Sequence, residues 1–159
     1  MPWYTKKSIS FGLYLAFLLL LISRKWIGFD ISGIILVLPV IFLPDSRINL
    51  FSKWSFFALL MPLSYPVLGD RCLDLCAQAL IEEIFFRAYL MMSFSNLSSS
   101  FMFSLAHFLI YFDIFSALTF FPSLFFGFIY SKTNNLLLVT ALHHFSNVLW
   151  FGFLIELFT

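Results

Sequence analysis

Charged side chains are scarce in this chain of 159 residues, in which Asp, Glu, Lys and Arg together make up 11%. A soluble globular domain carries roughly 25% charged and about 45–50% apolar residues. Here 62% of the residues are hydrophobic and the mean hydropathy is +0.99. A soluble protein of this composition would expose large apolar patches and aggregate. The composition therefore excludes a soluble domain and indicates a protein whose solvent is the lipid bilayer.

A basic stripe is also lacking, and cysteines are few. The net charge is +1 and no basic stripe is present, which excludes nucleic acid as a partner. The two cysteines, Cys72 and Cys76, are four residues apart on a predicted helix. Two thiols on one helical face are more often inert packing than a disulfide or a metal pair, and we interpret them as packing.

A signal-peptide cleavage site is missing as well. Lys6 and Lys7 precede an apolar run that resembles the core of a signal peptide, but Ser23-Arg24-Lys25 follows it instead of a small-x-small site. We therefore expect an uncleaved first helix.

Apolar runs with short polar breaks fill the sequence and predict an all-α fold. A spanning helix needs roughly 20 apolar residues, so several of the shorter runs could be half-helices. Strands are not expected, because a spanning sheet must close into a barrel of alternating segments. We expect one polytopic membrane domain over residues 1–159, a transmembrane bundle of about six or seven helices, with N-terminal helices in 1–70 and the polar motifs in 71–159. The runs are approximately 9–22, 27–43, 54–68, 73–94, 97–112, 114–130 and 136–158.

The informative residues are the polar ones inside these runs. An ionisable side chain in the middle of a membrane costs roughly 2.5–3.5 kcal/mol on insertion scales, so a group of them is a functional hypothesis by default. Six residues form this group: Glu82, Glu83, Arg87, His107, His143 and Asn147.

Two adjacent carboxylates divide into different roles by helical geometry. Glu83 and Arg87 are four residues apart and face each other, so they are expected to form an internal ion pair. Glu82 is rotated by about 100° from Glu83 and lacks an obvious local counter-charge. We therefore interpret Glu83 as structural and Glu82 as available to act as a general base.

The other polar residues supply the remaining parts of a hydrolytic site. His143 and Asn147 share one helical face and could hold a developing oxyanion. His107, one turn after Phe103, could orient a water molecule against Glu82. No Ser, Cys or Thr lies clearly beside a base, which favours water as the nucleophile. His144 is rotated off the His143 face, and we interpret it as a packing residue.

Three of these patterns resemble, in order, the motifs of one known family. Glu82-Glu83-x-x-x-Arg87, Phe103-x-x-x-His107 and His143-x-x-x-Asn147 are similar to the motifs of the CPBP family, also called the Abi family. The family comprises CAAX prenyl proteases and bacteriocin-processing enzymes. The segment from Glu82 to Leu90 resembles its first motif, with Ala88 where Gly is usual, and the resemblance covers roughly 73–150.

The resemblance implies an intramembrane glutamic endopeptidase with a catalytic cavity inside the bilayer. It implies that Glu82 and His107 activate water, that His143 and Asn147 stabilise the oxyanion, and that Glu83 and Arg87 support the site together with Phe103. The substrate would be a membrane-anchored or lipid-modified protein, such as one with a CAAX-like tail or a C-terminal anchor. The short chain resembles small bacterial members that serve protein sorting in the inner (plasma) membrane. His-Glu-x-x-His is absent from the sequence, so we expect no metal and no other cofactor.

Two other functions fit part of the pattern. A non-enzymatic membrane scaffold or immunity protein would keep the fold and bind a partner. A small proton-coupled carrier would use intramembrane Glu and His as a relay. A relay needs ionisable residues spread along a path, whereas these residues lie in three predicted helices, which favours the enzyme.

Overall fold

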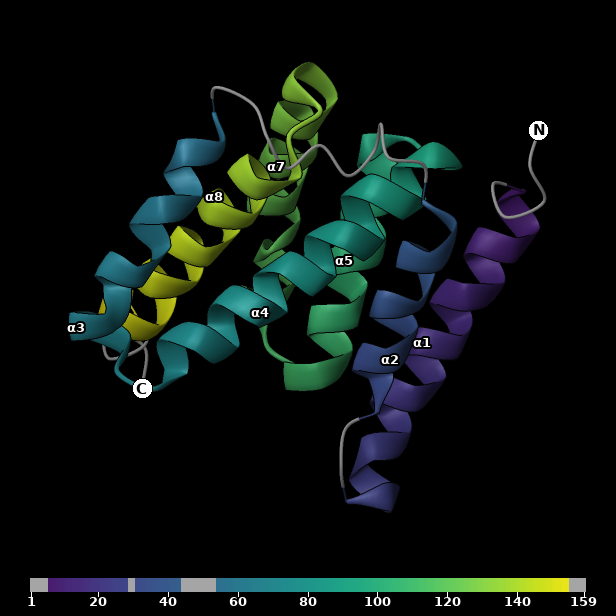
Figure 1. The fold of residues 1–159 in the computed structure, drawn as a ribbon. Coiled ribbons are helices and arrows are strands. Elements are labelled where there is room, and N and C mark those ends of the chain that lie inside the picture. The colour runs from purple at the N-terminus through teal and green to yellow at the C-terminus, as the bar shows by residue number, and fades with distance from the viewer. Residues whose placement is uncertain (1–5, 29–30, 44–53, 155–159) are drawn as a thin grey trace.

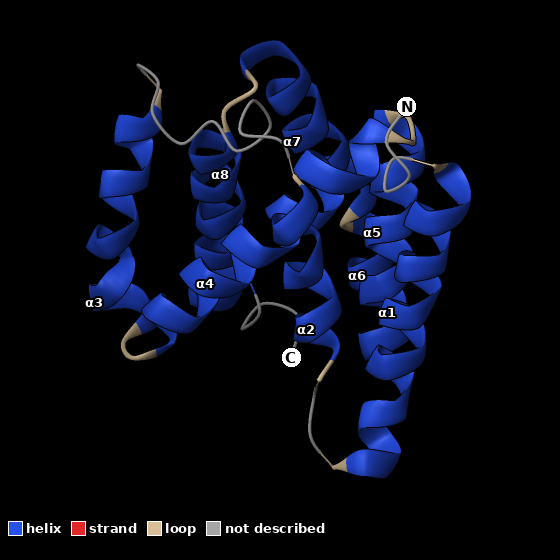
Figure 2. Cartoon of the chain, turned by 45° about the vertical axis from the view of Figure 1, so that its right-hand side comes forward, coloured by secondary structure: helices blue, strands red, loops and turns tan. Residues whose placement is uncertain are grey.

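The fold is all-α, as the sequence predicts. A computed structural model describes residues 6–28, 31–43 and 54–154, and within these ranges every regular element is helical and no strand occurs (Figures 1 and 2). The chain begins with α1 (Lys7–Ile27), α2 (Ser32–Val37) and the 3₁₀ helix η2 (Leu38–Phe42), followed by the 3₁₀ helix η4 (Ser55–Ser64) and α3 (Tyr65–Leu68). The second half contains α4 (Arg71–Glu83), η5 (Ile84–Tyr89), η6 (Leu90–Met92), α5 (Asn96–Tyr111), α6 (Ile114–Leu118), α7 (Phe120–Thr133), α8 (Leu136–Leu149) and η7 (Trp150–Leu154).

Consecutive helices join into longer rods. α2 continues into η2, η4 into α3, α4 into η5 and η6, α6 into α7, and α8 into η7. With α1 and α5 these make seven rods in the described part of the chain, within the predicted range.

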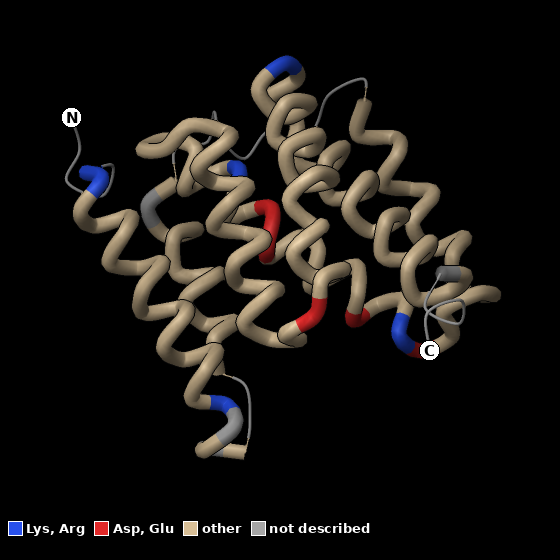
Figure 3. Tube along the Cα trace, turned by 180° about the vertical axis from the view of Figure 1, so that it is seen from behind, with Lys and Arg blue, Asp and Glu red and all other residues tan. Residues whose placement is uncertain are grey.

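Three rods are long and apolar enough to cross a bilayer, namely Lys7–Arg24, Ile114–Thr133 and Leu136–Phe153. The apolar helices Ser32–Ile41 and Ser55–Leu68 are shorter, as the lengths of the runs indicate. Charged positions are separated by long uncharged stretches of the trace (Figure 3). This pattern is that of a multi-pass membrane protein.

Two apolar clusters hold the rods together. The larger one combines residues of α1, α2, η5, α5, α7 and α8, with fully buried Phe85 and Leu136 among its members. The smaller one joins α3, α4 and α8 through Leu68, Cys72, Leu75 and Val148. α4 is packed against α8 and links the side of the bundle formed by η4 and α3 to that formed by α1 and α2 (Figure 1).

The turn between α7 and α8 is fixed by two consecutive asparagines. Asn134 ends α7 in the left-handed conformation, with φ of 48°, a conformation that Asn tolerates better than most residues. Asn135 begins α8, and its side chain accepts a hydrogen bond from the backbone N–H of Leu138 at 2.8 Å. These caps set where α8 begins, and therefore where His143 lies along it.

Gly127 allows α7 to approach the start of α5. A Cβ atom at this position would collide with the side chain of Asn96, whose amide donates a hydrogen bond to the carbonyl of Leu124 at 2.9 Å. The absence of a side chain at Gly127 therefore leaves room for the side chain of Asn96 against α7.

Candidate active site

The first motif lies where α4 changes its winding. α4 ends at Glu83, and η5 from Ile84 to Tyr89 is a π-helix. The sequence predicts an uninterrupted run here, because apolar periodicity does not reveal a local change of winding. Short π segments inside α-helices are frequent at functional sites. Glu82, Glu83 and Arg87 all become buried at this junction.

Glu83 and Arg87 form the predicted ion pair. Arg87 Nε donates to Glu83 Oε2 at 3.0 Å, and both side chains are fully buried. Arg87 Nη2 also donates to the Ser123 hydroxyl of α7 at 2.7 Å, and the guanidinium lies 5.7 Å from the centre of the Phe103 ring. The pair thus connects η5 to α5 and α7.

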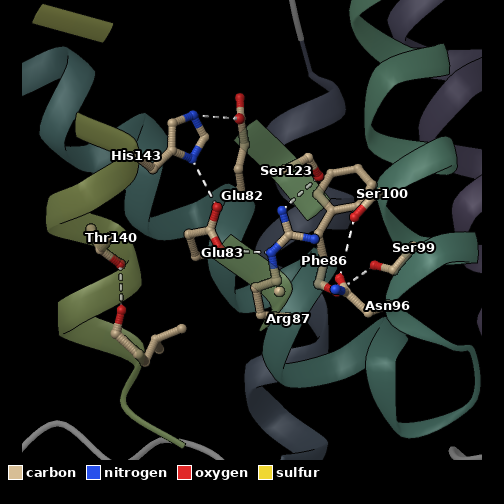
Figure 4. A network of polar contacts seen from close by, with 12 residues as sticks. Glu82, Glu83, Phe86, Arg87, Asn96, Ser99, Ser100, Ser123, Thr140 and His143 are labelled. Atoms are coloured by element: carbon tan, nitrogen blue, oxygen red, sulfur yellow. Dashed lines mark hydrogen bonds and ion pairs between the residues drawn. The ribbon is translucent and has the colours of Figure 1, made fainter. Parts of the chain in front are cut away.

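The structure adds a partner to both carboxylates that spacing along one helix does not show. His143 bridges the two carboxylates: its Nδ1 lies 2.9 Å from Glu83 Oε1 and its Nε2 lies 3.6 Å from Glu82 Oε2 (Figure 4). Spacing along one helix reports only local neighbours, and His143 comes from α8, sixty residues later in the chain.

The two oxygens of Glu82 have different surroundings. Gln78, one turn earlier on α4, donates from Nε2 to Glu82 Oε1 at 2.8 Å. Glu82 Oε2 is buried and has no hydrogen-bond partner among the described residues. A buried polar atom without a partner is costly, and here it marks the oxygen that is available to a further donor such as water.

Phe103 connects the three motifs. Its ring stacks on His107 with centroids 4.3 Å apart, and it meets His143 edge-on at 5.6 Å. His107 Nδ1 lies 3.1 Å from the Phe103 carbonyl oxygen, a contact in which only the nitrogen can donate. That bond leaves the other ring nitrogen, Nε2, as an acceptor when the ring is neutral. His107 contacts Phe103, which in turn contacts His143, and it forms no hydrogen bond or ion pair with Glu82.

Asn147 and His144 differ in the way the helical faces predict. Asn147 is half-buried on the His143 face, and its carboxamide makes no hydrogen bond to a described residue. His144 is fully buried, and its Nε2 lies 2.8 Å from the Ser64 hydroxyl. His144 therefore belongs to a different cluster, on the side of α8 that faces η4 and α4.

Two residues of the site were not predicted. Ser123 interrupts the apolar run of α7, and its isolated polarity was a usable signal. Gln78 lies four residues before Glu82 and therefore on the same helical face, so its contact was also readable from spacing. An apolar hollow of about 500 Å³, lined by Phe11, Phe94, Leu97, Ser98, Phe101, Met102 and Phe120, includes none of the predicted site residues. A catalytic cavity at Glu82 therefore stays a prediction.

The charges of the cluster can balance. His143 Nδ1 is within hydrogen-bonding distance of Glu83 Oε1, and Nε2, 3.6 Å from Glu82 Oε2, also carries a proton when the ring is in the imidazolium form. In that form Glu82, Glu83, Arg87 and His143 sum to zero, whereas a neutral imidazole would leave one uncompensated negative charge in a medium of low dielectric constant. The arrangement can hold a water molecule against a carboxylate and present cationic or polar donors beside it.

A comparison with known protein families found a match. Residues 56–149 match the family described as Type II CAAX prenyl endopeptidase Rce1-like. The match includes all three motifs and begins within η4, before the region of motif resemblance. Comparisons with curated proteins and with solved structures found no match. The match covers more than half of the chain, which therefore belongs to the Rce1-like family of type II CAAX prenyl endopeptidases, a family of intramembrane proteases.

Proposed function

We propose that this protein hydrolyses a peptide bond in a membrane-anchored or lipid-modified protein, using a water molecule activated by Glu82. One observation carries the proposal: a buried carboxylate oxygen, Glu82 Oε2, accepts no hydrogen bond from any residue that the structure describes and lies 3.6 Å from His143 Nε2. Family membership supports the reaction class.

The reaction needs one proton acceptor, one nucleophile and one site for negative charge. Glu82 takes a proton from water while the water oxygen attacks the scissile carbonyl carbon. The carbonyl oxygen becomes an oxyanion, for which His143 and Asn147 are the proposed donors. Glu82 then gives the proton to the leaving nitrogen as the C–N bond breaks, and a carboxylic acid and an amine are released. His107 is the proposed second group that orients the water.

Supporting residues hold these groups in place. Gln78 occupies one oxygen of Glu82 and leaves the other for water. Glu83 holds the Nδ1 side of His143, and Arg87 neutralises Glu83. Phe103 packs against both imidazoles and the guanidinium. We propose that these side chains fix orientation and that none of them reacts.

The substrate class and setting extend the same proposal. We propose that catalysis uses no metal or other cofactor, because the chain's own groups supply the base and the oxyanion donors. We also propose the bacterial inner (plasma) membrane as the location, and a C-terminal anchor or a CAAX-like tail as the substrate.

The test compares two substrates with reconstituted enzyme. One is a farnesylated peptide with a CAAX tail, and the other is a protein that ends in a hydrophobic C-terminal anchor; mass spectrometry identifies the cleaved bond. Glu82→Gln keeps the volume of the side chain but cannot accept a proton, so cleavage should fall by about 10²–10⁴-fold. Asp74→Asn is the matched control, because Asp74 is an exposed carboxylate on the same helix.

The control should cleave at the unmodified rate, and Glu82→Gln should yield the same amount of folded protein as the unmodified chain. Cleavage by Glu82→Gln at the unmodified rate would refute the glutamate mechanism and favour a scaffold or a carrier.

A further inference from the structure

A second buried polar cluster lies on a different face of α8 from the proteolytic residues. It contains Cys72 and Cys76 of α4, His144 of α8 and Ser64 of η4. Ser64 Oγ lies 3.2 Å from Cys72 Sγ and 2.8 Å from His144 Nε2. Cys76 Sγ lies 3.4 Å from His144 Nδ1 and 3.7 Å from Nε2. Four polar side chains from three helices therefore meet at one point.

The cluster is enclosed by apolar packing. Cys72, His144 and Ser64 are buried and Cys76 is half-buried, and Cys72 also belongs to the smaller apolar cluster with Leu68, Leu75 and Val148. The sequence shows only two thiols on one helical face. The structure adds an imidazole from the far end of the chain, a neighbour that helical spacing cannot reveal.

We propose that Cys72, Cys76 and His144 bind one thiophilic divalent metal ion of the zinc class. One donor atom from each residue lies within 4.8 Å of the other two. Tetrahedral zinc has Zn–S distances of about 2.3 Å and Zn–N distances of about 2.0–2.1 Å, which place donor atoms roughly 3.5–4 Å apart. Small side-chain movements would therefore bring the three donors to an ion, and the Ser64 hydroxyl is adjacent to the remaining position.

The charge of such a site suits a buried location. Binding releases the two thiol protons, so two thiolates and a neutral imidazole surround a dication. The sum is zero, which avoids the penalty for an isolated charge in an apolar medium. In the structure the thiols, the hydroxyl and the imidazole are in hydrogen-bonding contact with one another.

The ion would be structural and separate from catalysis. His144 follows His143, and the two side chains differ in direction by about 100° around α8. The ion would join α4, η4 and α8, and so hold the helix that presents His143. None of the six polar residues proposed for proteolysis belongs to this group of donors.

Metal analysis of purified protein tests the site. The protein is prepared with reduced thiols, loaded with Zn²⁺ in detergent and freed of excess ion. We expect about one zinc ion per chain. Cys76→Ser removes one donor with little change of shape, and zinc content should fall by about tenfold or more. His143→Gln is the matched control, because it removes the neighbouring imidazole and should leave the zinc content unchanged.

Cobalt gives a measurement on the unmodified chain that does not depend on any variant folding. Co²⁺ bound by thiolates produces an intense sulfur-to-metal charge-transfer band, which should appear on loading and disappear when Zn²⁺ is added. Failure of the unmodified chain to retain Zn²⁺, or absence of this band, would overturn the proposal. Loss of zinc in His143→Gln with retention in Cys76→Ser would overturn it too, by assigning the ion to the proteolytic cluster.

Discussion

Arg87 should be essential for the folded state. Its guanidinium is fully buried, donates to Glu83 at 3.0 Å and to Ser123 at 2.7 Å, and lies over the Phe103 ring. Arg87→Met keeps much of the apolar volume but leaves Glu83 as a buried carboxylate with His143 as its remaining partner. Removing one member of a buried pair costs about 3–5 kcal/mol, a large part of the roughly 5–15 kcal/mol by which folded proteins are stable.

The assay is thermal unfolding in detergent, together with the yield of monodisperse protein from membranes. Arg87→Met should lower both strongly. Arg87→Lys should recover only part of the loss, because one ammonium group lacks the planar fork that reaches both Glu83 and Ser123. Glu83→Gln combined with Arg87→Met should be more stable than Arg87→Met alone, because the uncompensated charge is gone.

Glu82→Gln is the reference variant, since it changes a buried carboxylate that has no bond to Arg87. It should unfold at the same temperature as the unmodified chain. Equal destabilisation by Glu82→Gln and Arg87→Met would refute the division of the two carboxylates into a reacting and a supporting group.

Three further outcomes are expected. Exhaustive chelation should leave turnover per folded molecule unchanged, even if it lowers the unfolding temperature; loss of turnover per folded molecule that stoichiometric zinc restores in Cys76→Ser as well would make Glu82, His107 and His143 metal ligands instead. Asn147→Ala should slow cleavage by about 10²–10³-fold if its amide stabilises the oxyanion. His144→Ala should have a much smaller effect on turnover per folded molecule, and equal effects of the two variants would contradict the assignment of Asn147 to the catalytic face of α8 and of His144 to another face. Gln78→Leu removes a hydrogen bond to a carboxylate, worth roughly 1.4 kcal/mol, so kcat should fall by about tenfold while the folded yield stays unchanged. An unaltered kcat would show that Gln78 does not support catalysis.

The composition and the lengths of the apolar runs were enough to predict an all-α bundle. They could not predict the π segment of η5, since a local change of winding leaves the apolar pattern intact. They also could not predict the close contact of α5 and α7, in which the side chain of Asn96 lies against Gly127.

The site was predictable wherever its contacts are local. The Glu83–Arg87 pair was predicted from its spacing of four residues. The contact between Gln78 and Glu82, which have the same spacing, could have been predicted in the same way. The bridge from His143 to both carboxylates was not predictable, because it depends on how α8 is rotated against α4. The same rotation brings His144 to the cysteines. Both polar clusters therefore depend on the packing of α4 against α8, which the sequence alone does not show.

The ion pair within one rod has a consequence for how the protein enters the membrane. Glu83 and Arg87 leave the ribosome together, whereas His143 follows about sixty residues later. An acidic residue entering the bilayer alone would carry its full insertion cost during that interval. Because Arg87 lies in the same segment, the charge of Glu83 is already compensated when this helix inserts. α8 is synthesised later and adds the imidazole of His143. The order of synthesis is therefore compatible with a buried polar centre that no single helix could stabilise in full.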